Sequence, residues 1–205
     1  MSTIDTTDIP ETIRELGPAR PQRADALRNY EKLIAAARDA FAQDGASASL
    51  EEIARRAEVG IGTLYRHFPN RQTLLEAVYI DELQALCASA ATLSELPPWD
   101  ALVAWLYRFV AYLATKRALA QELLNYLDGD AALFQSCRAG LYAAGEPLLQ
   151  RAQEAEAVRA DTNLTEIIQM VGGIAKIPGL EPEQVEHILE VALDGLRYRA
   201  PVGQP

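Results

Sequence analysis

The segment Ser49–Leu75, SLEEIARRAEVGIGTLYRHFPNRQTLL, predicts two short helices joined by a tight turn, with a third helix beginning directly after them. Ser49 and Glu52 have the spacing of a capping box, in which each side chain bonds an unpaired backbone N–H at a helix start. The apolar residues that follow repeat at helical spacing: Leu50, Ile53, Ala54 and Ala57. Gly60 can then begin the second helix without steric cost. The segment therefore predicts a helix-turn-helix unit.

The second short helix, expected over Ile61–Phe68, has one apolar face and one face suited to contact with DNA. Leu64 and Phe68 share the apolar face. The other positions carry small, hydroxyl, aromatic and cationic groups: Gly62, Thr63 and Arg66, flanked by Tyr65 and His67. Pro69 ends this helix, and Asn70 can cap the next one. A short helix anchored by two apolar residues, with such groups facing outward, is typical of helices that read the major groove.

This segment resembles the DNA-binding domain of the TetR family of bacterial transcription regulators. The resemblance rests on Phe41 and Gly45 at the end of the preceding helix, then on IARRAEV, on GTLYRHF and on NRQTLL. Several residue types at fixed offsets make it more specific than a single short motif. The resemblance implies that the TLYRHF run is the recognition helix and that the cation after it, Arg71, holds a phosphate. Glu58 and Gly60 depart from the family pattern, which has a small turn residue and a serine or alanine there.

The expected DNA-contacting residues follow from the faces of the predicted helices and from the family resemblance. They are Ser49, Arg55, Ile61, Gly62, Thr63, Tyr65, Arg66, His67, Asn70 and Arg71. Tyr65 and Arg71 are expected on phosphates, and Thr63 and Arg66 on base edges. The structural alternative is a packed three-helix unit in which Tyr65 and His67 are half-buried polar residues. The functional alternative is an all-helical protein-interaction module that does not bind DNA.

The net charge of −10 argues against a nucleic-acid partner until it is divided along the chain. Residues 1–19 carry a net charge of −3, residues 20–71 carry +2 and residues 72–205 carry −9. The segment expected to meet phosphates is therefore the only basic one. An acidic remainder repels DNA and helps to hold the rest of the protein away from the duplex.

Composition limits the class of protein further. With 49% apolar residues the chain can bury a core, and no apolar run is long enough to cross a membrane. Its start is polar and acidic rather than signal-like, so we expect a cytoplasmic protein with no membrane partner. Cys87 and Cys137 are expected to be reduced and buried. His67 and His187 lack metal-ligand spacing, and no phosphate-binding glycine loop or G-x-S-x-G motif is present, so we expect no enzyme, metal or cofactor.

The remaining chain predicts an all-α fold. We expect a flexible arm over 1–24, a DNA-binding domain over 25–71 and a helical effector-binding and dimerisation domain over 72–205. Helices are predicted over 25–44, 70–93, 99–115, 118–128, 131–156, 163–176 and 182–199. Pro147 is expected to kink the fifth of these, Asn163 with Glu166 to cap the sixth, and Pro182 to occupy the first turn of the last.

The resemblance implies that the second domain encloses a pocket for an unidentified small effector. Aromatic residues with polar tips suit pocket walls. The candidates are Trp105, Phe109, Tyr112, Tyr126, Phe134, Tyr142 and Met170. The alternative for each aromatic residue is ordinary core packing.

The resemblance also implies a homodimer that pairs through its last two helices on a palindromic stretch of double-stranded DNA. Each of these helices carries an apolar stripe. The candidate interface residues are Ile167, Val171, Ile174, Leu189, Leu193 and Leu196. A stripe of this kind can equally face the core of its own chain.

Overall fold

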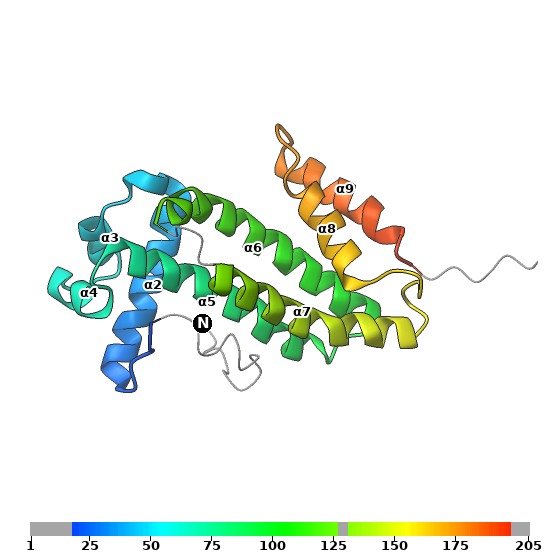
Figure 1. The fold of residues 1–205 in the computed structure, drawn as a ribbon, viewed down its shortest axis with the longest axis horizontal. Coiled ribbons are helices and arrows are strands. Elements are labelled where there is room, and N and C mark those ends of the chain that lie inside the picture. Colours follow the sequence, from blue (N-terminus) through cyan, green and yellow to red (C-terminus); the bar gives the residue numbers. More distant parts are fainter. Residues whose placement is uncertain (1–17, 127–130, 198–205) are drawn as a thin grey trace, which may run out of the picture. The chain divides into compact units, whose positions relative to one another are not determined.

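The computed structural model describes residues 18–126 and 131–197, without the side chains of residues 46, 115–126, 131–134 and 182. Its helices are α2 (Ala24–Asp44), the 3₁₀ helix η2 (Gly45–Ser47), α3 (Leu50–Arg56), α4 (Ile61–His67), α5 (Arg71–Leu93), α6 (Pro98–Tyr126), α7 (Ala131–Glu154), α8 (Leu164–Ile174) and α9 (Pro182–Asp194) (Figure 1). Within the described residues, β pairing is limited to one antiparallel bridge between Val158 and Arg197. The all-α prediction is confirmed.

Most predicted helices are found, with two differences. Helix α6 is continuous from Pro98 to Tyr126, so the predicted break near residue 116 is wrong. Lys116 and Arg117 are good helix formers, and neither removes a backbone hydrogen bond. The last helix ends at Asp194 rather than at residue 199. Helix α7 runs through Pro147.

The predicted helix starts of the C-terminal part are confirmed. Asn163 and Glu166 form a complete capping box at α8, in which each side chain bonds the other residue's backbone N–H. Pro182 lies at the first turn of α9, where its missing N–H has no cost.

The described residues divide into two compact units. The α2–α4 unit comprises 18–85, 114–126 and 131–138, and the α8–α9 unit comprises 86–113 and 139–197. Helix α5 begins in the first unit and ends in the second. None of the helices in the described part of the chain combines the length and apolarity of a membrane span.

In the α2–α4 unit, α2 packs against both short helices. Its predicted apolar face is buried: Leu33, Ala36, Ala37, Ala40 and Phe41. Ile53 of α3 and Leu64 of α4 are fully buried as well. Each short helix has too few residues to be stable alone, so it depends on packing against this core. The core therefore also sets the angle between α3 and α4.

In the α8–α9 unit, the two last helices lie side by side. Trp105 of α6 is fully buried and donates from Nε1 to the Leu86 carbonyl at 3.3 Å. Gly145 of α7 packs directly on its ring, and a Cβ there would lie 2.5 Å from Cη2 of Trp105. The residue at position 145 must therefore lack a side chain for α7 to approach α6 this closely.

Candidate nucleic-acid interface

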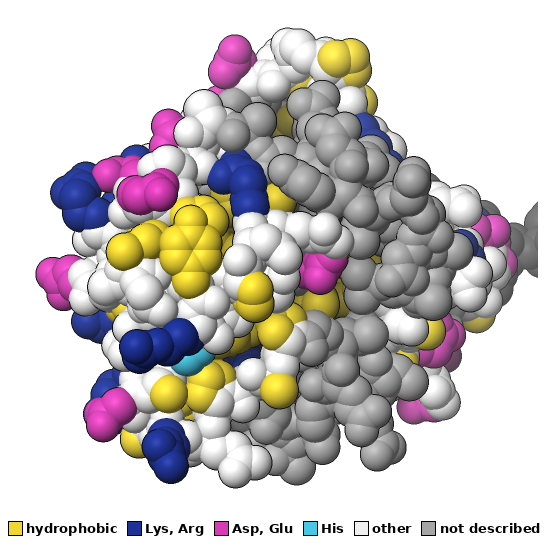
Figure 2. Space-filling view, turned by 60° about the vertical axis from the view of Figure 1, so that its left-hand side comes forward, with side chains coloured by type: hydrophobic (Ala, Val, Ile, Leu, Met, Phe, Trp, Pro, Cys, Tyr) yellow, Lys and Arg dark blue, Asp and Glu magenta, His cyan; other side chains and the backbone are white. Residues whose placement is uncertain are grey.

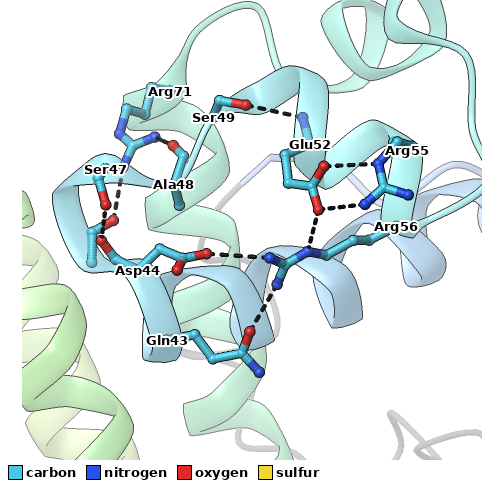
Figure 3. Close-up of polar contacts among 10 residues, drawn as sticks. Gln43, Asp44, Ser47, Ala48, Ser49, Glu52, Arg55, Arg56 and Arg71 are labelled. Carbon is cyan, nitrogen blue, oxygen red and sulfur yellow. Dashed lines mark hydrogen bonds and ion pairs between the residues drawn. The ribbon is translucent and has the colours of Figure 1, made fainter.

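Helix α3 starts at Ser49, whose Oγ accepts from the Glu52 backbone N–H at 3.0 Å. Half of the predicted capping box is therefore confirmed. The reciprocal half is wrong, because the Glu52 carboxylate accepts from Arg55 at 2.7 and 2.8 Å and from Arg56 at 2.8 Å (Figure 3). Two guanidinium groups are stronger partners for a carboxylate than one backbone N–H. These hydrogen bonds lower the pKa of Glu52 to about 2.

The two arginines of α3 have different surroundings. Arg56 also donates to Gln43 at 3.0 Å and to Asp44 at 3.3 Å, so it ties α3 to the end of α2 (Figure 3). The side chain of Arg55 is 74% exposed and its guanidinium is paired with Glu52. Of the pair, Arg55 is the one presented to solvent.

The turn between α3 and α4 contains a backbone conformation that favours glycine. Glu58 has a φ of 55°, and its N–H bonds the Arg55 carbonyl at 3.1 Å. The next residue, Val59, is buried and bonds the Ala54 carbonyl. A glutamate in the left-handed region is strained by about 1–2 kcal/mol. The departure of Glu58 from the family pattern therefore has a structural cost.

Helix α4 has the two faces that its sequence predicts. Leu64 and Phe68 are fully buried, while Gly62 and Arg66 are exposed, and Ile61 and Tyr65 are 39% and 44% exposed. A Cβ added at Gly62 would meet nothing within 4 Å, so the backbone of α4 is open to a close approach there. Figure 2 shows this side of the molecule, where exposed hydrophobic side chains lie among Lys and Arg side chains, with Asp and Glu side chains interspersed.

Two predicted contact residues on α4 are less accessible. Thr63 and His67 are half-buried. The His67 ring lies 6.0 Å from that of Tyr30, edge to face, and 6.1 Å from that of Phe68. Burial lowers the pKa of His67, which favours the neutral ring.

The start of α5 holds the turn before α3 in place. The guanidinium of Arg71 donates from Nη1 to the Ala48 carbonyl and from Nη2 to the Gly45 carbonyl at 3.1 Å (Figure 3). Its Cζ lies 4.9 Å from the centre of the Phe41 ring. Asn70 caps α5, as predicted, by accepting from the Thr73 N–H at 2.9 Å. Arg71 is thus engaged with its own chain at the place where the resemblance implies a phosphate contact.

One charged cluster was missed by the sequence analysis. Arg20 donates to Asp81 and, at 3.2 Å, to Gln84, while Arg38 pairs with Asp81 at 3.0 Å and with Glu82. Arg20 therefore fastens the residues before α2 to α5. The predicted flexible arm over 1–24 includes this fastened part, and its residues 1–17 lie outside the described residues. No short-range motif links Arg20 to Asp81, which lies far along the chain.

Three of the candidate effector-binding residues lie along one face of α6. Trp105, Phe109 and Tyr112 are buried and stack in a row with 6.3 Å between successive ring centres. They pack as core residues. Tyr142 and Met170 are half-buried. The side chains of Tyr126 and Phe134 lie outside the described residues.

Most candidate dimer residues face the core of their own chain. Ile174 is half-buried, and the buried ones are Ile167, Val171, Leu189, Leu193 and Leu196. Another side of α9 carries two exposed apolar residues, Ile188 at 36% and Val191 at 62% exposure. The periodicity located the apolar stripe correctly, but a single chain already covers it.

No group of three or more histidine, cysteine, aspartate or glutamate side chains in the described residues could hold a metal ion.

Comparison with known proteins assigns both parts of the chain to related families. Residues 33–78 match the family described as bacterial regulatory proteins, tetR family, and residues 97–198 match the C-terminal domain of regulators similar to SbtR.

Solved structures are similar over nearly their whole length. A TetR transcriptional regulator from Streptomyces coelicolor is 38% identical, with 83% of this chain and 99% of that chain covered and a TM-score of 0.74. A TetR regulatory protein from Mycobacterium vanbaalenii is 34% identical, with coverages of 86% and 99% and a TM-score of 0.73.

A shorter similarity reaches the TetC protein of transposon Tn10 from Escherichia coli, which is 32% identical over 94 residues. The match covers 45% of this chain, and the chain spans about half of that relative's length, 48%.

Proposed function

The chain belongs to the TetR family of DNA-binding transcription regulators, and from that premise we propose that it is a homodimeric repressor. It binds a palindromic operator and leaves it when a small-molecule effector binds. Proteins of this family regulate transcription without catalysing a reaction. As an operator-binding protein, it works in the bacterial cytoplasm.

The observation that carries this proposal is the two-faced helix α4. Leu64 and Phe68 fix it on the core, and its other face presents Gly62, Tyr65 and Arg66 to solvent. Among the described residues, none pairs with the exposed Arg66 guanidinium, so this side chain is available to a base edge. Arginine reads guanine through two parallel hydrogen bonds, which is the commonest specific contact in the major groove.

Phosphate contacts complete the proposed interface. The exposed side chains of Tyr65 and Arg55 suit phosphate oxygens, as does the N-terminal end of α3 at Ser49. Ile61 and Thr63 provide apolar contacts beside Arg66, and His67 and Asn70 lie at the far end of the recognition helix. Arg71 acts indirectly, by holding the turn from which α3 starts.

The dimer forms through the exposed faces of α8 and α9. Ile188 and Val191 give α9 an apolar strip that the described residues of its own chain leave uncovered. Gly173 on α8 is exposed, and a Cβ there would meet nothing within 4 Å, which allows a second helix to approach closely. A single recognition helix reads few base pairs, so two copies on a palindrome are needed for specificity.

Selection from random DNA tests the proposal. The full-length chain should enrich a palindrome whose half-sites are about 34–36 Å apart, one helical turn. Its affinity should fall steeply with salt, because phosphate binding releases counterions. A protein-interaction module, the alternative function, would enrich no sequence and would show no salt-dependent retention on DNA.

A matched pair of variants tests the dimer face. Val191→Glu places an unpaired charge on the proposed interface, so it should yield a folded monomer in sedimentation. Val171→Glu places the same charge in the chain's own core and should unfold the α8–α9 unit instead. A Val191→Glu protein that remains dimeric would place the interface elsewhere.

A further inference from the structure

A groove of about 290 Å³ opens in the α8–α9 unit between the C-terminal parts of α5 and α7. Its walls are mostly small apolar side chains: Cys87, Ala90, Ala91, Ala143, Ala144 and Pro147. Small-molecule sites in proteins usually occupy about 300–1,000 Å³. A groove just below that range suits a compact ligand.

The groove exists because the residues that face each other are small. On α5, Cys87 and Ala91 are four residues apart and so share a face, and Ser94 follows directly after the end of the helix. On α7, Ala143 and Pro147 share a face in the same way. A larger side chain at any of these positions would occupy the space between the helices.

Arg151 lines the groove as well, and it is the groove's cationic group. Its Nη1 donates to the Ser94 carbonyl and its Nη2 to the Leu96 carbonyl at 2.8 Å. These carbonyls follow the end of α5, where helical partners run out. The Nε–H of Arg151 is buried, and no atom of the described residues accepts its hydrogen bond.

The guanidinium of Arg151 also lacks a carboxylate partner. Within the described part of the chain, no carboxylate lies within 4.0 Å of its guanidinium, whereas Arg38, Arg55 and Arg56 each have at least one. A buried donor without an acceptor is costly, and a charged one more so. A cation with an unused donor at an apolar groove is complementary to an anion with an apolar body.

We propose that this groove is the effector site and that the effector is a compact amphiphilic anion. Its apolar part lies on the alanine walls, and a carboxylate or similar group pairs with the guanidinium of Arg151. This inference rests on the proposed function, since it names the ligand class of the regulator. It differs from the aromatic pocket expected from the sequence, because Trp105, Phe109 and Tyr112 are not among the residues that line this groove.

Binding to the full-length protein tests the ligand class. The probes are straight-chain carboxylates from butanoate to decanoate, each with its matching alcohol, monitored by NMR of labelled alanine methyl groups. At least one carboxylate should shift the methyl signals of Ala90, Ala91, Ala143 and Ala144. The matching alcohol should bind about tenfold more weakly, since it lacks the negative charge that pairs with the guanidinium. No bound carboxylate, or equal binding of acid and alcohol, would overturn the proposal.

Two variants separate the site from a purely structural role of Arg151. Arg151→Gln keeps an amide donor for the carbonyls after α5, so the fold should persist while carboxylate affinity falls about tenfold. Ala143→Leu fills the groove from its exposed rim, and the equally exposed Ala139→Leu on the same helix is its control. Unchanged carboxylate binding in Arg151→Gln, together with a lower melting temperature, would show that Arg151 only stabilises the end of α5 and does not bind the ligand.

The effector role is tested on the selected operator. A binding carboxylate should weaken operator affinity of the wild-type dimer at least about fivefold, the lower end of typical allosteric coupling, and should have no effect on Ala143→Leu. If the dimer binds its operator and ignores the carboxylate, the groove proposal fails while the proposed function stands. If the chain binds no DNA, the proposed function fails, and the effector role fails with it.

Discussion

Replacing Arg71 by alanine gives the sharpest test of how the helix-turn-helix, α3 and α4, is held against α2 and α5. The substitution removes the hydrogen bonds to the Ala48 and Gly45 carbonyls and the contact with the Phe41 ring. A partly exposed charged donor contributes about 1 kcal/mol for each hydrogen bond, and the cation–π contact about 0.5–1 kcal/mol. We therefore expect the free energy of unfolding to fall by about 2–3 kcal/mol in urea titrations.

DNA binding separates this structural role from a phosphate contact. If Arg71 acts by positioning α3, Arg71→Ala should weaken binding while the dependence of log affinity on log salt keeps its slope. A phosphate contact would lower that slope by about 0.9. Arg66→Ala is the control for stability, since an exposed side chain without a partner among the described residues should change it by less than about 0.5 kcal/mol. Full stability of Arg71→Ala with a reduced slope would refute the positioning role.

Three further substitutions have defined outcomes. Gly145→Ala should lower the free energy of unfolding by about 1–3 kcal/mol, because its Cβ would lie 2.5 Å from the Trp105 ring; an unchanged urea midpoint would contradict this packing. Glu58→Gly should raise the free energy of unfolding by about 0.5–1 kcal/mol by relieving the left-handed backbone, and equal or lower stability would show that no strain is stored there. Burial lowers the pKa of His67, so as the pH drops below 6.5 this histidine is protonated in the unfolded chain before it is protonated in the folded one. The free energy of unfolding should therefore fall below pH 6.5. His67→Phe should remove that part of the pH dependence in urea titrations at pH 5 and 7.

The helix-turn-helix was predictable because the sequence signals that define it are local. The Ser49 cap, the buried pair Leu64 and Phe68, and the cap at Asn70 lie within a few residues of the helices that they define. Short-range spacing is enough to place such groups, since helix geometry fixes which side chains share a face. The family resemblance added the function, which no spacing alone provides.

The partners of the charged side chains were not predictable in the same way. The carboxylate of Glu52 could accept from a backbone N–H or from two arginines, and it accepts from the arginines because charged donors form stronger hydrogen bonds. Arg71 reaches carbonyls 23 and 26 residues earlier in the chain, which become neighbours only after α2 and α5 pack. Pairing of this kind depends on tertiary structure.

The proposed dimer interface shows a second limit of prediction from the sequence. Periodicity identified the apolar stripe of α8 and α9, with Val171 and Leu193 among its members, but both are buried within the single chain. A hydrophobic period shows that a face will be covered and not which surface covers it. Val191 is exposed and has only one apolar neighbour at helical spacing among the exposed residues of α9, Ile188, so its periodic signal is much weaker than that of the buried stripe.

The most direct test of the central claim is the specificity of Arg66→Ala. The affinities of the wild-type protein and the variant are measured at one fixed salt concentration, on the selected operator and on a scrambled duplex of equal length. We expect a loss of about 1–3 kcal/mol in binding free energy on the operator, with relaxed preference at one position per half-site and little change on scrambled DNA. Equal losses on both duplexes, or a wild-type protein that does not prefer the operator, would contradict the claim that α4 reads the sequence.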